Sequence, residues 1–245
     1  MTVPAIYQGL WRRTGIWRSN GTSDLSTQVW WFQSASFHID LRIPIDRPSM
    51  DSRAQLARLA PAQLARFSAQ TGCAGKTVVT GDRCEWRPEI AFPALSADLD
   101  AGWMRFDSED AVHETGIDNS YEEDWIRMAS APMRGVRLEA TGSPVLAGSA
   151  GSPAVAYLII GERWMAWACG SPSDAYSPGT PDHGAWSEFT VLHKGGDWRI
   201  AGSNCAWLEG QEVSDADALA AQPLSPAEIT TLPFAPGHWR VTALA

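Results

Sequence analysis

Three ionisable side chains alternate along one short segment and could form a binding surface. His38, Asp40 and Arg42 occupy every second position between Phe37 and Ile43, so a β-strand would place all three on one face. An imidazole can carry a proton, a carboxylate accepts hydrogen bonds, and a guanidinium can hold an anion. The pattern predicts either a ligand pocket with Arg42 as the anion anchor or a structural ion pair at an interface.

The preceding segment, 28–33, indicates how this polar face is paired. A connection of even length between the two strands pairs Gln33 with His38 and Trp31 with Asp40. An odd length would mix apolar and polar side chains on both faces, so the even register is favoured. A tryptophan among ionisable groups suits neither open water nor a dry core, which predicts a sheltered, partly hydrated space such as a barrel lumen. The opposite, apolar face then contains Trp30, Phe32, Ile39 and Leu41.

Two further segments contribute polar candidates. Residues 83–92 alternate apolar side chains with arginine and glutamate, and Pro88 removes one ladder donor, which predicts an edge strand or a bulge. The segment 113–125 adds carboxylates, a tyrosine and a tryptophan around a turn. The candidate ligand-binding residues are Arg12, Trp31, Gln33, His38, Asp40, Arg42, Arg87, Glu114, Tyr121, Glu123 and Trp125.

The charge of the chain lies in one region. The formal net charge is −9, and the stretch from Asp98 to Asp124 contains ten acids and only one base, Arg105. This balance argues against nucleic acid and anionic membranes as partners. The acidic stretch predicts solvated strand faces and turns or, as an alternative, a face that docks a basic protein partner.

Short alternating segments separated by turns predict a mainly β, antiparallel fold. Strands are expected near 9–18, 27–33, 37–43, 76–80, 83–92, 101–107, 110–117, 121–129, 134–141, 153–160, 163–169, 186–193, 197–202 and 238–243. One helix is expected near 52–70, interrupted at Pro61 and closed by Gly72, with a short helix near 215–221. The segment around Pro132 resembles a boundary, which divides the chain into domains 1–130 and 131–245.

Several common sites have no signature in this sequence. The four cysteines lack a Cys-x-x-Cys pair and the five histidines lack close metal-binding spacing, so no metal and no cofactor is predicted. No run of 18 apolar residues and no apolar N-terminal region occurs, which predicts a cytoplasmic protein. The cysteines are then expected as reduced, buried side chains.

The first half of the chain resembles a known family. The segments 10–44, 84–92 and 113–125 are similar to a group of uncharacterised bacterial proteins related to the fungal HRI1-like proteins of the calycin-like superfamily. The matching motifs are the Asp-x-Ser-Thr turn at 24–27, the strand end with Trp31 and Gln33, and the strand with Asp40 and Arg42. The resemblance implies two lipocalin-like barrels or half-barrels packed together, the second smaller, and carries no catalytic residue.

Three functions follow as hypotheses. The leading one is a non-enzymatic binding protein for a small, partly apolar and anionic ligand held in a barrel pocket. The second is a protein interaction module that uses the acidic face 98–124. The third is an enzyme with a histidine–glutamate acid–base pair, for which His38 or His113 with Glu114 is the candidate.

Overall fold

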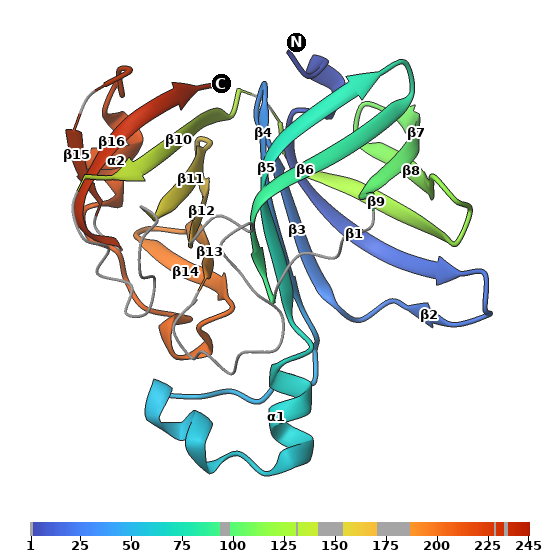
Figure 1. Cartoon of the computed structure of the whole chain (residues 1–245), viewed down its shortest axis with the longest axis horizontal. Helices are drawn as coiled ribbons and strands as arrows, with labels where there is room; N and C mark the ends of the chain where they lie inside the picture. The colour runs from blue at the N-terminus through green and yellow to red at the C-terminus, as the bar shows by residue number, and fades with distance from the viewer. Residues whose placement is uncertain are drawn as a thin grey trace.

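The computed structural model describes residues 2–93, 99–130, 132–141, 154–170, 187–227, 229–232 and 235–245. These residues form two packed bodies, a closed barrel and a second sheet, and every described strand pairing is antiparallel (Figure 1). The prediction of a mainly β, antiparallel fold is confirmed.

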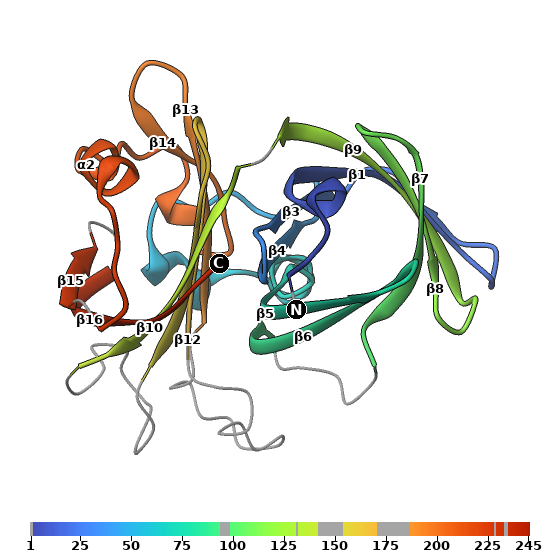
Figure 2. The same cartoon turned by 90° about the horizontal axis from the view of Figure 1, so that it is seen from above.

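The first body closes because its last strand pairs with its first (Figure 2). Strands adjacent in the chain are adjacent in the barrel, as in an up-and-down meander. The barrel strands are β1 (Gly9–Arg18), β3 (Gln28–Gln33), β4 (Phe37–Ile43), β5 (Thr71–Thr80), β6 (Arg83–Phe92), β7 (Ala101–Ser108), β8 (Ala111–Gly116) and β9 (Tyr121–Ser130), with β2 (Ser23–Asp24) beside β1.

The β3–β4 hairpin has the even register. Gln33 pairs with His38 and Trp31 pairs with Asp40, as the alternation predicts. Trp31 and Asp40 therefore face the barrel lumen, where they are 1% and 6% exposed. The apolar face of the hairpin points outward and packs in the core between the two bodies. Each strand is buried on both faces, which explains why aromatic residues follow one another in β3.

The second body is a seven-stranded sheet of order β14-β13-β12-β11-β10-β16-β15. In the described residues no pairing joins β14 to β15, so the barrel-like closure expected for this half is not seen. Its strands are β10 (Arg134–Ala140), β11 (Val155–Ile160), β12 (Trp164–Gly170), β13 (Glu188–Lys194), β14 (Trp198–Ser203), β15 (Ile229–Leu232) and β16 (Ala235–Leu244). The chain after β14, with η4 (Ala206–Leu208) and α2 (Ala216–Ala221), covers the face that points away from the barrel.

Glycines allow the two bodies to approach closely. A Cβ atom on Gly72 of β5 would lie 2.8 Å from the ring of Phe189, and one on Gly202 of β14 would lie 2.6 Å from the ring of Trp30. Both aromatic rings belong to the core between the bodies. Larger residues at these two positions would separate the layers, so the packing explains the glycines.

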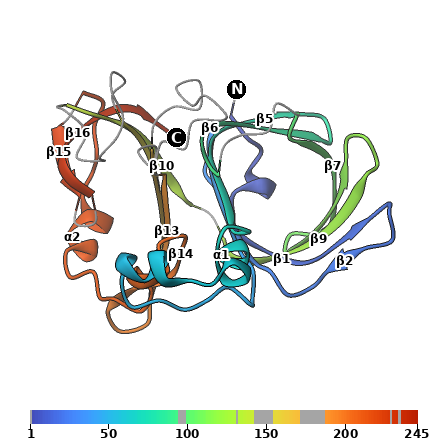
Figure 3. The ribbon, with the colours of Figure 1, turned by 60° about the horizontal axis from the view of Figure 1, so that its bottom comes forward.

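The helical segment after β4 differs in part from the prediction. Pro61 begins α1 (Pro61–Phe67), and the preceding turns form a separate 3-10 helix, η2 (Arg53–Arg58) (Figure 3). The predicted interruption at Pro61 is therefore confirmed. Proline suits the first position of a helix, which explains why α1 begins there. The predicted end at Gly72 is wrong, since α1 ends at Phe67 and Gly72 lies inside β5. A short 3-10 helix at the N-terminus, η1, spans Ala5–Tyr7.

Candidate functional site

Tryptophans fill the middle of the barrel lumen. Trp31 lies at the centre, with ring centroids 5.6 Å from both Trp86 and Trp125 and 6.1 Å from Trp11. All four rings are buried. They come from inward-facing positions on four strands, β1, β3, β6 and β9. The lumen is consequently a packed core over most of its length, and only its ends could hold a ligand.

One end of the lumen is closed by the N-terminal segment. Trp11 Nε1 donates to the carbonyl oxygen of Tyr7 at 2.7 Å, which holds η1 over the barrel. Behind this plug, Thr77 donates to Gln33 at 2.8 Å, and His38 Nδ1 lies 3.1 Å from the Thr77 hydroxyl. Burial lowers the pKa of His38 to about 3. His38 is therefore neutral, has no exposed surface, and cannot reach a substrate.

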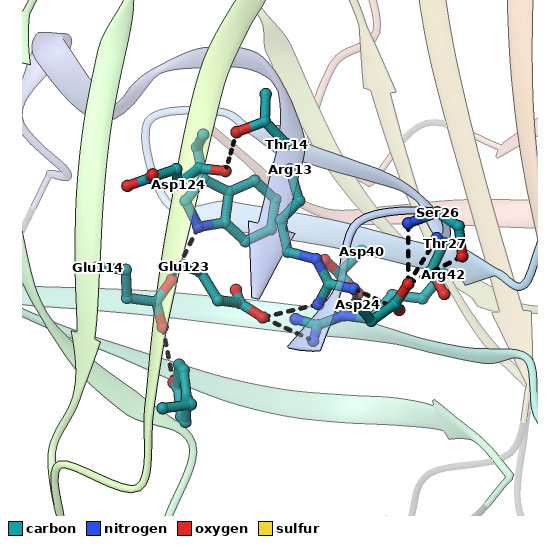
Figure 4. A network of polar contacts seen from close by, with 12 residues as sticks. Arg13, Thr14, Asp24, Ser26, Thr27, Asp40, Arg42, Glu114, Glu123 and Asp124 are labelled. Carbon is teal, nitrogen blue, oxygen red and sulfur yellow. Dashed lines mark hydrogen bonds and ion pairs between the residues drawn. The ribbon is translucent and has the colours of Figure 1, made fainter. Parts of the chain in front are cut away.

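The other end of the lumen contains a charged network, here called the charged end, made of Arg13, Arg42, Asp24, Asp40 and Glu123. Arg13 Nη1 donates to Glu123 Oε1 at 2.7 Å, and Arg42 Nη1 lies 3.7 Å from the same oxygen. Figure 4 shows one Glu123 oxygen facing both guanidinium groups. Arg42 Nε also donates to Asp40 at 2.7 Å, and Arg13 contacts Asp24 at 3.3 Å. The side chains of Arg13 and Glu123 are only 4% and 2% exposed.

A tight turn fixes Asp24 at the rim of this network. Backbone N–H groups of Ser26 and Thr27 donate to Asp24 Oδ1 at 2.9 and 3.1 Å. Although burial opposes it, these hydrogen bonds hold the pKa of Asp24 below its ordinary value. The Asp-x-Ser-Thr motif therefore supplies an ionised carboxylate that faces Arg13 (Figure 4).

Glu114 lies deeper, and within the described residues no basic side chain forms an ion pair with it. The Tyr121 hydroxyl lies 2.7 Å from Glu114 Oε1, and Trp125 Nε1 donates to Oε2 at 3.1 Å. Glu114 is 3% exposed. Burial, followed by the negative charge of Glu123, raises the pKa of Glu114 to about 8. The carboxyl group therefore holds a proton at neutral pH. A cation bound beside it would favour loss of that proton.

A small cavity of about 20 Å³ connects Glu114 with the rim. Its volume is enough for about one water molecule. Arg42, whose side chain is 35% exposed, and the exposed Asp100 form its outer part, whereas Trp31 and Glu114 form its buried part. The complete lining is Trp31, Asp40, Arg42, Cys73, Trp86, Asp100, Glu114 and Trp125.

The structure brings most of the predicted site residues together and separates four of them. Arg12 and Arg87 are exposed on the outer face, because Trp11, Arg13 and Trp86 take the neighbouring inward positions. Gln33 and His38 lie instead at the end of the lumen that the N-terminal segment closes. The charged end and its cavity contain the other predicted residues, Trp31, Asp40, Arg42, Glu114, Tyr121, Glu123 and Trp125.

The sequence interpretation missed Arg13 and Asp100. Arg13 follows Trp11 by two positions, the same spacing that places Trp31 beside the polar face of its strand, so the signal was present in β1. Asp100 has no such signal, since it lies in a segment of irregular structure before β7.

The acidic stretch does not form one continuous face. Glu114 and Glu123 point into the lumen, whereas outside the barrel Asp124 accepts from His113 Nδ1 at 2.7 Å. Asp98 lies outside the described residues. Because His113 and Glu114 are consecutive on β8, they point to opposite sides of the barrel wall and cannot act as an acid–base pair.

Neither a family model nor a curated protein nor a solved structure matches this chain. The resemblance to the HRI1-like proteins stays a prediction. In the described part of the chain, no helix has the length and apolar character needed to cross a membrane.

Proposed function

We propose that the protein binds a small molecule through a positively charged amino group that enters the charged end of the barrel. The observation that carries the proposal is an excess of carboxylates beside tryptophan rings. Among the described residues, the four carboxylates Asp24, Asp40, Asp100 and Glu123 lie near two guanidinium groups, those of Arg13 and Arg42.

An anion has weaker support here than the sequence suggested. Arg42 is already paired with Asp40 and lies close to Glu123, so an anionic ligand would have to displace a carboxylate. An ammonium group instead meets Asp40, Asp100 and Glu114 in the cavity wall. The walls also contain Trp31, and tryptophan faces attract cations.

The size of the cavity limits what enters. About 20 Å³ accepts one water-sized group, so only the amino group of the ligand would enter the lumen. The remainder of the ligand would stay at the rim beside Arg42 and Asp24, whose side chains are 35% and 26% exposed. The proposed ligand is therefore a primary amine with a small apolar or polar body.

Buried ions support a function at this end. Replacing a buried ion pair with apolar residues is often neutral or stabilising, so a barrel built only for stability has little need of Arg13 and Glu123. We also retain the calycin type as part of the proposal, with the second sheet as a half-barrel. Its support is the sequential antiparallel order of the eight closed strands.

Isothermal titration calorimetry with phenethylamine and with 3-phenylpropionate tests the proposal. The amine is expected to bind and the carboxylate of similar shape is not. Binding should release protons near pH 7, because the arriving ammonium favours ionisation of Glu114, whose pKa is raised to about 8. Two buffers of different ionisation enthalpy reveal this release.

The matched variants are Asp100→Asn and Asp107→Asn. Asp100 lines the cavity, whereas Asp107 lies outside the barrel and pairs with Arg105. Losing one charge-assisted contact is expected to weaken amine binding about tenfold in Asp100→Asn, with no change in Asp107→Asn. Equal binding of amine and carboxylate, or equal effects of the two variants, would contradict the proposal.

A further inference from the structure

A second and larger depression lies where the two bodies meet, here called the seam groove. Its walls are the end of β9, with Met128 and Ala129, the turn 161–163 between β11 and β12, and Trp164 at the start of β12. Ile160 and Ala220 of α2 also line it. The groove has a volume of about 670 Å³, which falls in the range of small-molecule sites. The lumen cavity is far smaller, so the two places would take different ligands.

The seam groove contains two cations without carboxylate partners in the described part of the chain. Arg134 donates to backbone carbonyls at the end of α2, including that of Gln222 at 2.9 Å. Arg163 donates to the carbonyl oxygen of Lys194 at 2.9 Å. These bonds fix the guanidinium groups but leave their charge unneutralised. Glu162 lies on the same turn, so the lining carries two positive charges and one negative charge.

Apolar and aromatic surface accompanies these charges. Trp164 is half-buried and packs on His193 with ring centroids 4.2 Å apart. Met128 is 42% exposed and Ile160 is 3% exposed. The groove therefore combines a net positive lining with a tryptophan wall, in a chain of net charge −9.

We propose that the seam groove binds a flat aromatic anion, with its ring against Trp164 and Met128 and its acidic group between Arg134 and Arg163. The ligand is expected to be an anion because each guanidinium group still has N–H donors that can bind the oxygens of an acidic group. The rest of the ligand is expected to be flat and apolar, because the groove is large enough for an aromatic ring and has an aromatic wall. The site is independent of the amine site at the charged end.

The experiment uses the fluorescent probe 8-anilinonaphthalene-1-sulfonate on the folded full-length chain. One molecule is expected to bind per chain, with an increase in probe fluorescence and no change in circular dichroism. N-phenyl-1-naphthylamine has the same rings without the sulfonate and is expected to bind at least about tenfold more weakly. Phenethylamine is expected not to displace the probe.

Two variants and one control locate the probe. Arg163→Met removes a groove cation but keeps an unbranched side chain of similar flexibility, and Met128→Glu places an acid on an exposed position of the wall. Each is expected to weaken binding of the sulfonate about tenfold or more. Arg105→Met removes an arginine that is 69% exposed and lies outside the groove, and should leave binding unchanged. Absence of binding, equal binding of both probes, or binding that survives Arg163→Met and Met128→Glu overturns the proposal.

Discussion

Replacing Glu123 with leucine should be strongly destabilising. Glu123 is 2% exposed and accepts from Arg13, whose side chain is 4% exposed. Glu123→Leu keeps similar volume but, of the partners seen in the described residues, leaves Arg13 with Asp24, at 3.3 Å and on a side chain that is 26% exposed. Removing one partner of a buried ion pair costs about 3–5 kcal/mol. That is a large part of the about 5–15 kcal/mol by which a domain is stable.

The double variant Arg13→Met/Glu123→Leu separates two explanations of this loss. It removes both buried charges, while Arg42 keeps Asp40 and Asp24 keeps the N–H groups of its turn. Its stability should return to the native value or exceed it, because no buried ion is left unpaired.

Urea unfolding followed by circular dichroism measures both variants at neutral pH, with Asp107→Asn as a surface control. The free energy of unfolding should fall by about 3–5 kcal/mol in Glu123→Leu and recover in the double variant. A loss below about 1 kcal/mol in the single variant would show that Arg13 is not confined as described. A double variant as unstable as the single one would mean that the Arg13–Glu123 pair itself stabilises the barrel. The burial of this pair would then no longer support a function at the charged end.

Three further predictions concern pH, packing and thiol reactivity. Because the folded state keeps a proton on Glu114 up to a pKa of about 8, the contribution of Glu114 to stability should fall as pH rises from about 4.5 to about 8, by at most about 5 kcal/mol. Urea midpoints across this range should slope less in Glu114→Gln, and equal slopes would refute the assignment. Gly202→Ala should cost about 1–3 kcal/mol by clashing with Trp30, whereas Gly195→Ala meets open space and should cost less; equal midpoints would contradict the packing. The buried thiols of Cys84, Cys169 and Cys205 should react with a disulfide reagent only after unfolding, and rapid labelling of the native protein would show that they are accessible.

The register of the first hairpin could be predicted because strand alternation is a local property. Only a connection of even length between 28–33 and 37–43 separates apolar from polar side chains, and the structure has an even register. The sheltered polar face followed from Trp31 alone, since a tryptophan beside Asp40 and Arg42 needs partial enclosure.

The composition of the charged end could not be predicted, because barrel closure decides it. Arg13 and Glu123 are 110 positions apart and meet only because β9 pairs with β1. In the sequence Glu123 belongs to a run of acids that resembles a solvated surface. Which of these acids turn inward depends on the register of β8 and β9, and no local pattern fixes it.

Arg87 shows a related limit. Its alternation with Glu85 was compatible with either face of β6, and the burial of Trp86 decides for the outer one. The predicted effect of Pro88 is confirmed, since the β5–β6 register shifts where Gly75 meets Pro88. Regular alternation would place Trp86 and Ile90 on the same face of β6. Because of the shift, Trp86 faces the lumen and Ile90 lies in the core between the two bodies.

A crystal structure of the protein soaked with 4-bromophenethylamine tests the central claim most directly. The account predicts an anomalous bromine peak at the rim beside Arg42, with the amino group in the cavity between Asp40, Asp100 and Glu114. A bromine peak in the seam groove alone, or no peak while the lumen cavity holds only water, would contradict it.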